Sequence, residues 1–137
     1  MTTRKRHAQL TEVVFPEHAN HYGTLFGGNA LHLMAKAAFL AARGFARRDV
    51  VMARCSDAQF HVPVRLGSVL TLDAQVLRVG RSSLTVHVTG FADDLAADQP
   101  GVALEAVFEM VAVDAAGRPS PIAEAAHDPL NEMKVPA

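Results

Sequence analysis

The chain has 137 residues, thirteen basic and fourteen acidic side chains, and 50% apolar residues. This length predicts a single domain, and the apolar content is too high for a disordered chain. The net charge of −1 provides no general attraction for nucleic acid or anionic lipid, so an anionic ligand would need a local cluster of basic residues.

The cysteine content and the hydropathy pattern indicate where in the cell the protein is expected. The single cysteine, Cys55, cannot form an internal disulfide, which fits a reducing environment. No apolar stretch of a signal peptide follows the basic N-terminus, and the longest apolar tract, residues 31–45, is too short to span a bilayer and is interrupted by His32, Lys36 and Arg43. We therefore expect a soluble cytoplasmic protein that contacts neither membrane nor nucleic acid.

The first predicted elements are a strand at residues 10–15, ended by Pro16, and a turn-rich segment at 17–28. Three glycines within six positions of that segment permit close backbone approach and positive φ angles. A helix is predicted from residue 29 to about residue 47. Its polar residues up to position 43 fall only at 29, 32, 36 and 43, on one narrow stripe, so we expect the helix to be buried on nearly all sides.

Strands are predicted at residues 51–61, 69–79, 84–89 and 104–113, where side-chain character alternates with period two. A tight hairpin turn is expected at 79–82 and a looser one at 94–101. One helix cannot cover both faces of so long a sheet, so we predict an α+β domain in which about five antiparallel strands curl around the helix. Its core spans about residues 10–115, and the tail from 117 to 137, with four prolines, is expected to be extended or mobile.

An open sheet leaves two edge strands with unpaired backbone groups. Pairing of such edges across a two-fold axis would remove one of them from each subunit. The pattern therefore predicts a homo-oligomer.

The most specific local motif is Pro-x-x-x-Asn-x-x-Gly-x-Leu-Phe-Gly-Gly at residues 16–28. Gly27 and Gly28 at a helix start would expose backbone N–H groups at the positive end of the helix dipole, where a phosphate or a reaction oxyanion can bind. Alternatively, the glycines only let the chain enter a crowded helix. Asn20 could polarise a carbonyl or orient a water, or it could simply be a turn residue.

Other polar residues give weaker signals. His18 and His21 lack a third ligand at suitable spacing, so no metal site is expected. His61 and His87 lie in predicted strands and are expected to be ordinary hydrogen-bonded side chains.

Arginine and hydroxyl groups gather at the predicted hairpin, where Arg81, Ser82 and Ser83 could bind phosphate if they face a pocket, and otherwise form a solvated turn. Arg47 and Arg48 could join them, as could Arg54.

From residue 16 to 113 the chain resembles the acyl-CoA hydrolases with the hotdog fold. The matching pieces occur in order: the motif at 16–28, the apolar helix, Asp-Ala-Gln-Phe at 57–60 with Pro-Val at 63–64 and Gly67, and Val-Gly-Arg-Ser-Ser at 79–83. The resemblance implies a curved sheet around a central helix, edge-to-edge homodimers that in the family are often assembled further into trimers of dimers, and an active site between subunits. It also implies hydrolysis of an acyl-CoA to a free fatty acid and coenzyme A, without a cofactor.

The resemblance also implies roles for particular residues. Asn20 would orient the thioester or the attacking water, and the backbone at Gly27 and Gly28 would receive the oxyanion. The hairpin residues Arg81, Ser82 and Ser83 would lie near the coenzyme.

One departure from the family concerns its acidic residue, a general base or nucleophile seven positions after the second glycine. Ala35 stands there, and loss of a general base costs about 10²–10⁴ in rate. Either the acid was removed deliberately, or the protein is a natural acyl-CoA binder without activity, or Asp57 has replaced the missing carboxylate; Ala35 would also pack well beside Leu31, Ala38 and Ala42. We favour a thioesterase scaffold that hydrolyses acyl-CoA slowly, with a non-catalytic acyl-CoA binding module as the alternative. A dehydratase would need a histidine base paired with an acid, and no helix histidine suits that role.

Overall fold

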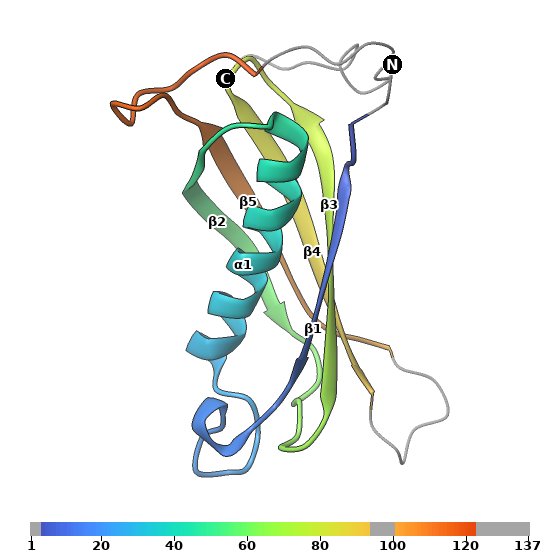
Figure 1. Ribbon diagram of the computed structural model, residues 1–137. Coiled ribbons are helices and arrows are strands. Elements are labelled where there is room, and N and C mark those ends of the chain that lie inside the picture. The colour runs from blue at the N-terminus through green and yellow to red at the C-terminus, as the bar shows by residue number, and fades with distance from the viewer. Residues whose placement is uncertain (1–3, 94–100, 123–137) are drawn as a thin grey trace.

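The computed structural model of the protein describes residues 4–93 and 101–122 (Figure 1). These residues form one long α-helix, a short 3-10 helix and five strands. In chain order the elements are β1 (His7–Val13), η1 (Pro16–His18), α1 (Gly27–Ala46), β2 (Val50–Phe60), β3 (Val69–Val79), β4 (Ser83–Asp93) and β5 (Val102–Ala112).

The five strands form one antiparallel sheet, as predicted. Their order, β1-β3-β4-β5-β2, differs from a simple meander because β2 pairs with β5 and not with β3. β3 has the predicted bounds, and the predicted hairpin joins it to β4, where the Gly80 N–H donates to the Ser83 carbonyl at 2.8 Å. β1 begins three residues earlier than expected because its pairing with β3 runs from His7 opposite Gln75 to Val13 opposite Val69. Residues 94–100 of the predicted looser turn lie outside the described residues.

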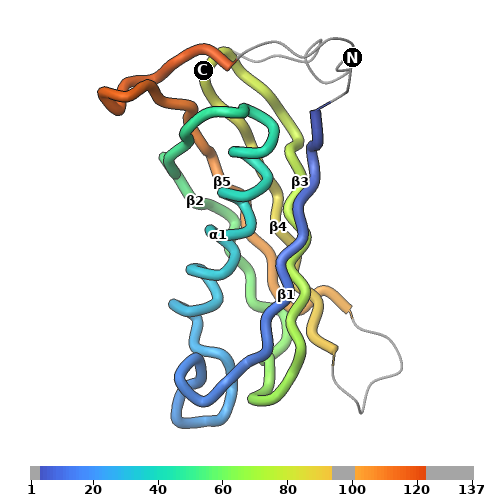
Figure 2. The backbone as a smooth tube through the Cα atoms, in the orientation of Figure 1, coloured from blue at the N-terminus to red at the C-terminus, as the bar shows by residue number. Residues whose placement is uncertain are grey.

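The helix α1 lies along the concave face of the curved sheet and contacts all five strands (Figures 1 and 2). Its inward side carries fully buried residues such as Met34 and Phe45. These pack with the inward residues of the strands, for example Leu72 and Phe108. Burial of each such large side chain contributes about 1.5–3 kcal/mol, so this contact is the main source of the domain's stability.

The prediction that α1 is buried on nearly all sides is wrong for a single chain. Phe39 and Leu40 are 38% and 43% exposed, beside the exposed Lys36 and Arg43. The sheet curls around one side of the helix only, and this leaves two large apolar side chains uncovered.

The edge strand β2 is also uncovered. Nearly every residue in it is exposed, including Val51 (49%), Met52 (52%) and Phe60 (51%). The opposite edge strand, β1, exposes mainly polar side chains such as Gln9 and Thr11. An unpaired apolar edge beside an uncovered helix side fits the predicted association of two chains, with β2 as the more suitable edge.

The segment after β5 returns to the hairpin between β3 and β4. The Ser120 N–H donates to the Ala112 carbonyl, and the Ile122 N–H donates to the Arg81 carbonyl, both at 2.8 Å. The rest of the predicted extended or mobile tail, residues 123–137, lies outside the described residues. Within the described part of the chain, no helix is both long and apolar enough to cross a bilayer.

Candidate functional site

The loop between β1 and α1 is held against the connection between β2 and β3. The Leu25 N–H donates to the Val64 carbonyl at 2.7 Å, and the Leu66 N–H donates to the Gly23 carbonyl at 2.9 Å. Gly23 has a φ of 79°, a conformation that glycine adopts without strain. The second half of the motif at 16–28 is therefore fixed against this connection.

Asn20 uses its side-chain oxygen to fold this loop. Its Oδ1 accepts from the backbone N–H groups of Tyr22 (2.9 Å) and Thr24 (3.2 Å) and from the Thr24 hydroxyl (3.2 Å). Asn20 is thus a turn residue, one of the two roles considered above. Its amide Nδ2 has no partner among the described residues, so the same side chain also offers two N–H donors to a ligand.

The two glycines begin α1 and differ in their surroundings. Among the described residues nothing accepts a hydrogen bond from the N–H of Gly27 or Gly28. A Cβ at Gly27 would meet nothing within 4 Å, and one at Gly28 would meet only the ring of Phe26, at 2.8 Å. Crowding at the helix entry therefore does not account for Gly27 in a single chain, and its open N–H lies at the positive end of the helix dipole.

An apolar pocket of about 240 Å³ opens beside this helix start. Gly27 and Ala30 line it from α1, and the remaining walls come from the preceding loop, from the β2–β3 region and from β5: Leu25, Phe60, Val62, Pro63, Val64 and Leu104. The pocket can therefore take an apolar group close to the start of α1.

Ala35 lies on α1 seven residues after Gly28, which places the two on one side of the helix about 10 Å apart along its axis. Its methyl group is partly buried against the core. Asp57, the alternative carboxylate, is exposed at a bulge in β2 with a φ of 52° and does not line the pocket. Within one chain neither residue supplies an acid beside Gly27.

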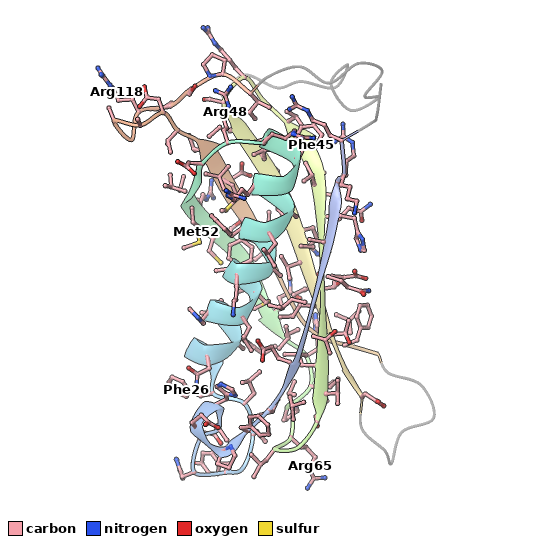
Figure 3. All side chains as sticks on the ribbon, viewed as in Figure 1. Phe26, Phe45, Arg48, Met52, Arg65 and Arg118 are labelled. Carbon is pink, nitrogen blue, oxygen red and sulfur yellow. The ribbon has the colours of Figure 1, made fainter. Side chains whose placement is uncertain are left out.

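The hairpin residues Arg81, Ser82 and Ser83 lie at the opposite end of the molecule. The Ala112 N–H donates to the Ser82 carbonyl at 2.7 Å, and this end holds the C-terminus of α1, where Figure 3 labels Phe45 and Arg48, far from Phe26. The twenty residues of α1 span about 30 Å. One chain therefore does not bring the helix start and the hairpin together.

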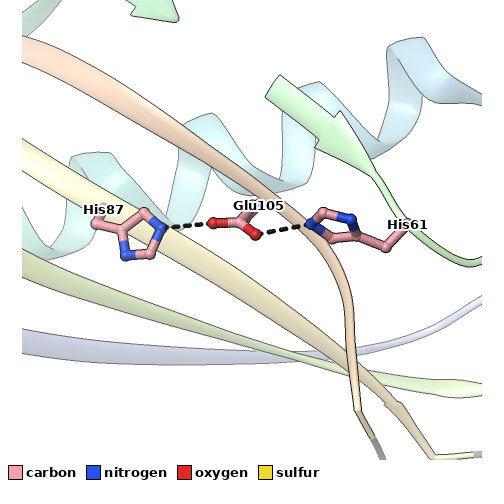
Figure 4. Close-up of polar contacts among 3 residues, drawn as sticks. All are labelled: His61, His87 and Glu105. Atoms are coloured by element: carbon pink, nitrogen blue, oxygen red, sulfur yellow. Dashed lines mark hydrogen bonds and ion pairs between the residues drawn. The ribbon is translucent and has the colours of Figure 1, made fainter. Parts of the chain in front are cut away.

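His61 and His87 share one carboxylate on the outward face of the sheet (Figure 4). Their Nε2 atoms lie 2.7 Å and 3.0 Å from the two oxygens of Glu105. Hydrogen bonds, first from His61 and then from His87, lower the pKa of Glu105. Both are the ordinary hydrogen-bonded histidines that the sequence predicted. Glu105 was missed because only the pairing of β5 with β2 and β4 brings it between them.

No group of three or more His, Cys, Asp or Glu side chains in the described part of the chain is arranged to hold a metal ion. His18 instead accepts a 3.4 Å hydrogen bond from the Phe15 N–H through its Nδ1.

Known proteins match this chain in sequence and in fold. A family model described as the thioesterase superfamily matches residues 22–97. An uncharacterized acyl-CoA thioester hydrolase of Zymomonas mobilis is 30% identical over 123 residues, which cover 90% of this chain and 79% of that protein.

Two solved structures superimpose closely. One is the acyl-CoA hydrolase of Staphylococcus aureus in complex with butyryl coenzyme A, coenzyme A and coenzyme A disulfide. Its TM-score is 0.80 at 29% identity, and the aligned region covers 85% of this chain and 71% of the hydrolase. The other is a hexameric broad-specificity acyl-coenzyme A thioesterase in which one aspartate is replaced by alanine. Its TM-score is 0.82 at 29% identity, and the aligned region covers 90% of this chain and 91% of the thioesterase. The helix on a five-stranded curved sheet is thus a hotdog fold. The chain belongs to the thioesterase superfamily.

The shared carboxylate gives a prediction for stability against pH. Because the pKa of Glu105 is lower in the folded state, its contribution to stability is fully present above the unfolded pKa of about 4.5 and is lost as the pH falls through the folded value. Glu105→Gln should therefore lower the free energy of urea unfolding at pH 7 and approach the native chain near pH 3. Glu17→Gln, at an exposed position outside the cluster, is the control, and a pH-independent effect of Glu105→Gln would contradict the assignment.

Proposed function

We propose that this protein binds acyl-CoA thioesters between two copies of the chain and hydrolyses them slowly, without a cofactor. The observation that carries the proposal is the open N–H of Gly27 at the wall of an apolar pocket, in the same motif as the donor amide of Asn20. An acyl chain in the pocket would direct its thioester carbonyl toward these donors.

Thioester hydrolysis needs stabilisation of the oxyanion that forms when water attacks the carbonyl. Fixed N–H donors at the positive end of a helix stabilise this charge without reorganising during the reaction. Gly27 is suited to this task because it leaves its N–H accessible, and Asn20 because hydrogen bonds to its Oδ1 fix its amide. The apolar pocket walls would keep bulk water from competing with the thioester for these N–H donors.

The slow rate follows from Ala35, since a methyl group cannot accept a proton from water. Variants of the Staphylococcus aureus relative replace an asparagine and an aspartate that are fifteen positions apart (43 − 28). Asn20 and Ala35 have the same spacing (35 − 20). This agreement supports the proposal that Ala35 stands where related enzymes carry an aspartate.

The requirement for two copies follows from the placement of the site residues. Asn20 and Gly27 lie at one end of α1 and Arg81 at the other. Pairing two β2 strands antiparallel across a two-fold axis reverses one chain relative to the other, which brings the hairpin end of the partner to the helix-start end of the first chain. Relatives described as hexameric are consistent with such pairing.

A second candidate function is acyl-CoA binding without hydrolysis. A threonine that was also replaced in the Staphylococcus aureus relative lies 32 positions after its asparagine (60 − 28), and Met52 stands 32 positions after Asn20 (52 − 20). Neither Ala35 nor Met52 carries a group that can accept a proton from water. This favours binding of acyl-CoA without hydrolysis.

Restoring the acid separates these two functions. Ala35→Asp should raise the rate of butyryl-CoA hydrolysis, followed by thiol release, by about 10²–10⁴, the usual contribution of a general base. Ala35→Asn, similar in shape but without a basic carboxylate, is the matched control and should leave the rate unchanged. If both variants stay folded and bind butyryl-CoA but neither gains activity, the binding module is correct.

The two roles of Asn20 can be separated in the Ala35→Asp background. Asn20→Asp keeps the oxygen that folds the loop but removes the N–H donors, so hydrolysis should fall by about 10²–10³ with little change in melting temperature. Asn20→Ala removes both, so it should lose activity and also lower the melting temperature. Full activity of folded Asn20→Asp would exclude the amide as a donor to the thioester.

Association through β2 can be tested with two valines on opposite edges of the sheet. Val51→Lys places a charge on the apolar β2 edge and should shift the mass measured by light scattering to that of the monomer, with loss of acyl-CoA binding. Val13→Lys changes a similarly exposed valine (39% against 49%) on β1 and should keep the native mass. The opposite result would move the interface to β1.

A further inference from the structure

The C-terminal end of α1 carries a basic pocket that the proposed function does not yet use. It has a volume of about 360 Å³ and is lined by Arg43, Gly44, Arg47 and Arg48. Arg43 lies in the last turn of α1, and Arg47 caps the helix, with its backbone N–H donating to the Arg43 carbonyl at 2.9 Å. The Arg47 backbone is left-handed, with a φ of 56°, at a position where glycine is the usual residue.

Basic residues also reach this end from the chain before β1. The Arg4 Nη1 donates to the Phe45 carbonyl at 3.0 Å, and its guanidinium lies 5.7 Å from the centre of the Phe45 ring. Desolvation first, and then repulsion from Arg47 and Arg48, lower the pKa of Arg4. Guanidinium groups from two separate elements thus lie close enough to repel one another.

Within the described part of the chain, no carboxylate forms an ion pair with Arg43, Arg47 or Arg48. The Arg48 Nη1 donates to the Ser120 hydroxyl at 2.6 Å, and its Nε is buried with no partner among the described residues. The macrodipole at a helix C-terminus amounts to only about half a negative charge, which does not neutralise three arginines.

A series of hydrogen bonds connects Arg48, in the basic pocket, to the hairpin between β3 and β4. Arg48 contacts Ser120, whose N–H donates to the Ala112 carbonyl, and the Ala112 N–H donates in turn to the Ser82 carbonyl. Hydroxyl and guanidinium donors of three separate segments therefore gather at one end of the molecule. This combination is suited to phosphate groups, which accept several charge-assisted hydrogen bonds at once.

We propose that Arg43, Arg47 and Arg48 bind the phosphate groups of the nucleotide part of coenzyme A, while the thioester lies at the start of α1 in the partner chain. This assignment of the ligand rests on the proposed function. It extends the phosphate-binding surface from the hairpin to the end of α1 and explains why so many arginines collect in a chain whose net charge is −1.

The experiment compares calorimetric binding of coenzyme A, adenosine 3′,5′-bisphosphate and pantetheine to the native chain and to Arg43→Gln/Arg47→Gln. Removal of the charges should weaken binding of coenzyme A and of the bisphosphate by about tenfold or more, the loss of at least one charge-assisted hydrogen bond. Binding of pantetheine, which has no phosphate, should stay unchanged. Arg118→Gln removes the same charge from an exposed position at the same end but outside the pocket, and should have little effect.

The outcomes distinguish this site from the proposed function. Unchanged coenzyme A affinity in the double variant, or an equal loss in Arg118→Gln, would overturn the arginine site and leave the proposed function standing. If the native chain binds the bisphosphate through these arginines but does not bind coenzyme A, the phosphate site stands and the proposed function fails. Binding of neither compound would overturn both.

Discussion

The contact between α1 and the concave face of the sheet determines the arrangement of everything else in the molecule. Small residues such as Ala37, Ala38 and Ala42 let the helix lie close to the strands, and larger ones such as Met34 and Phe45 fill the space at its sides. Because one helix spans the length of the sheet, its start and its end become the two ends of the domain. Chemistry that needs both ends cannot be completed by one chain.

The same contact explains why a single chain leaves large apolar side chains exposed to solvent. A sheet of five strands can cover only one side of α1, so Phe39 and Leu40 stay exposed beside the apolar edge strand β2. A second copy reversed by a two-fold axis would cover this region and bring a basic hairpin end to each helix start. Association of two copies would thus both cover the exposed apolar side chains and complete the proposed site.

Local patterns in the sequence were sufficient for the elements and for the class of fold. Period-two alternation located four of the strands, and β1 was displaced because its register with β3, rather than its own composition, sets its ends. The burial of α1 was overestimated because an apolar helix face looks the same in sequence whether its own chain or another chain covers it. Periodicity reports that a face is apolar and not what covers it.

The candidate site was predictable only in part. The motif at 16–28 singled out Asn20 and Gly27, but the two uses of the Asn20 amide depend on backbone N–H groups that only the folded loop brings together. Sequence could not say whether Arg47, Arg48 and Arg54 converge. The structure gathers the first two with Arg43 and places Arg54 on β2, because a helix end and an edge strand diverge in space.

The central claim is that two chains share each site, and complementation tests it most directly. Asn20→Asp and Arg81→Gln chains, co-expressed with different tags and purified as mixed pairs, would be titrated with butyryl-CoA in a calorimeter. A shared site predicts that each variant alone binds weakly, whereas a mixed pair regains one tight site, because an intact helix start from one chain meets an intact hairpin from the other. Mixed pairs that bind no more tightly than the separate variants would show that each chain forms its site alone.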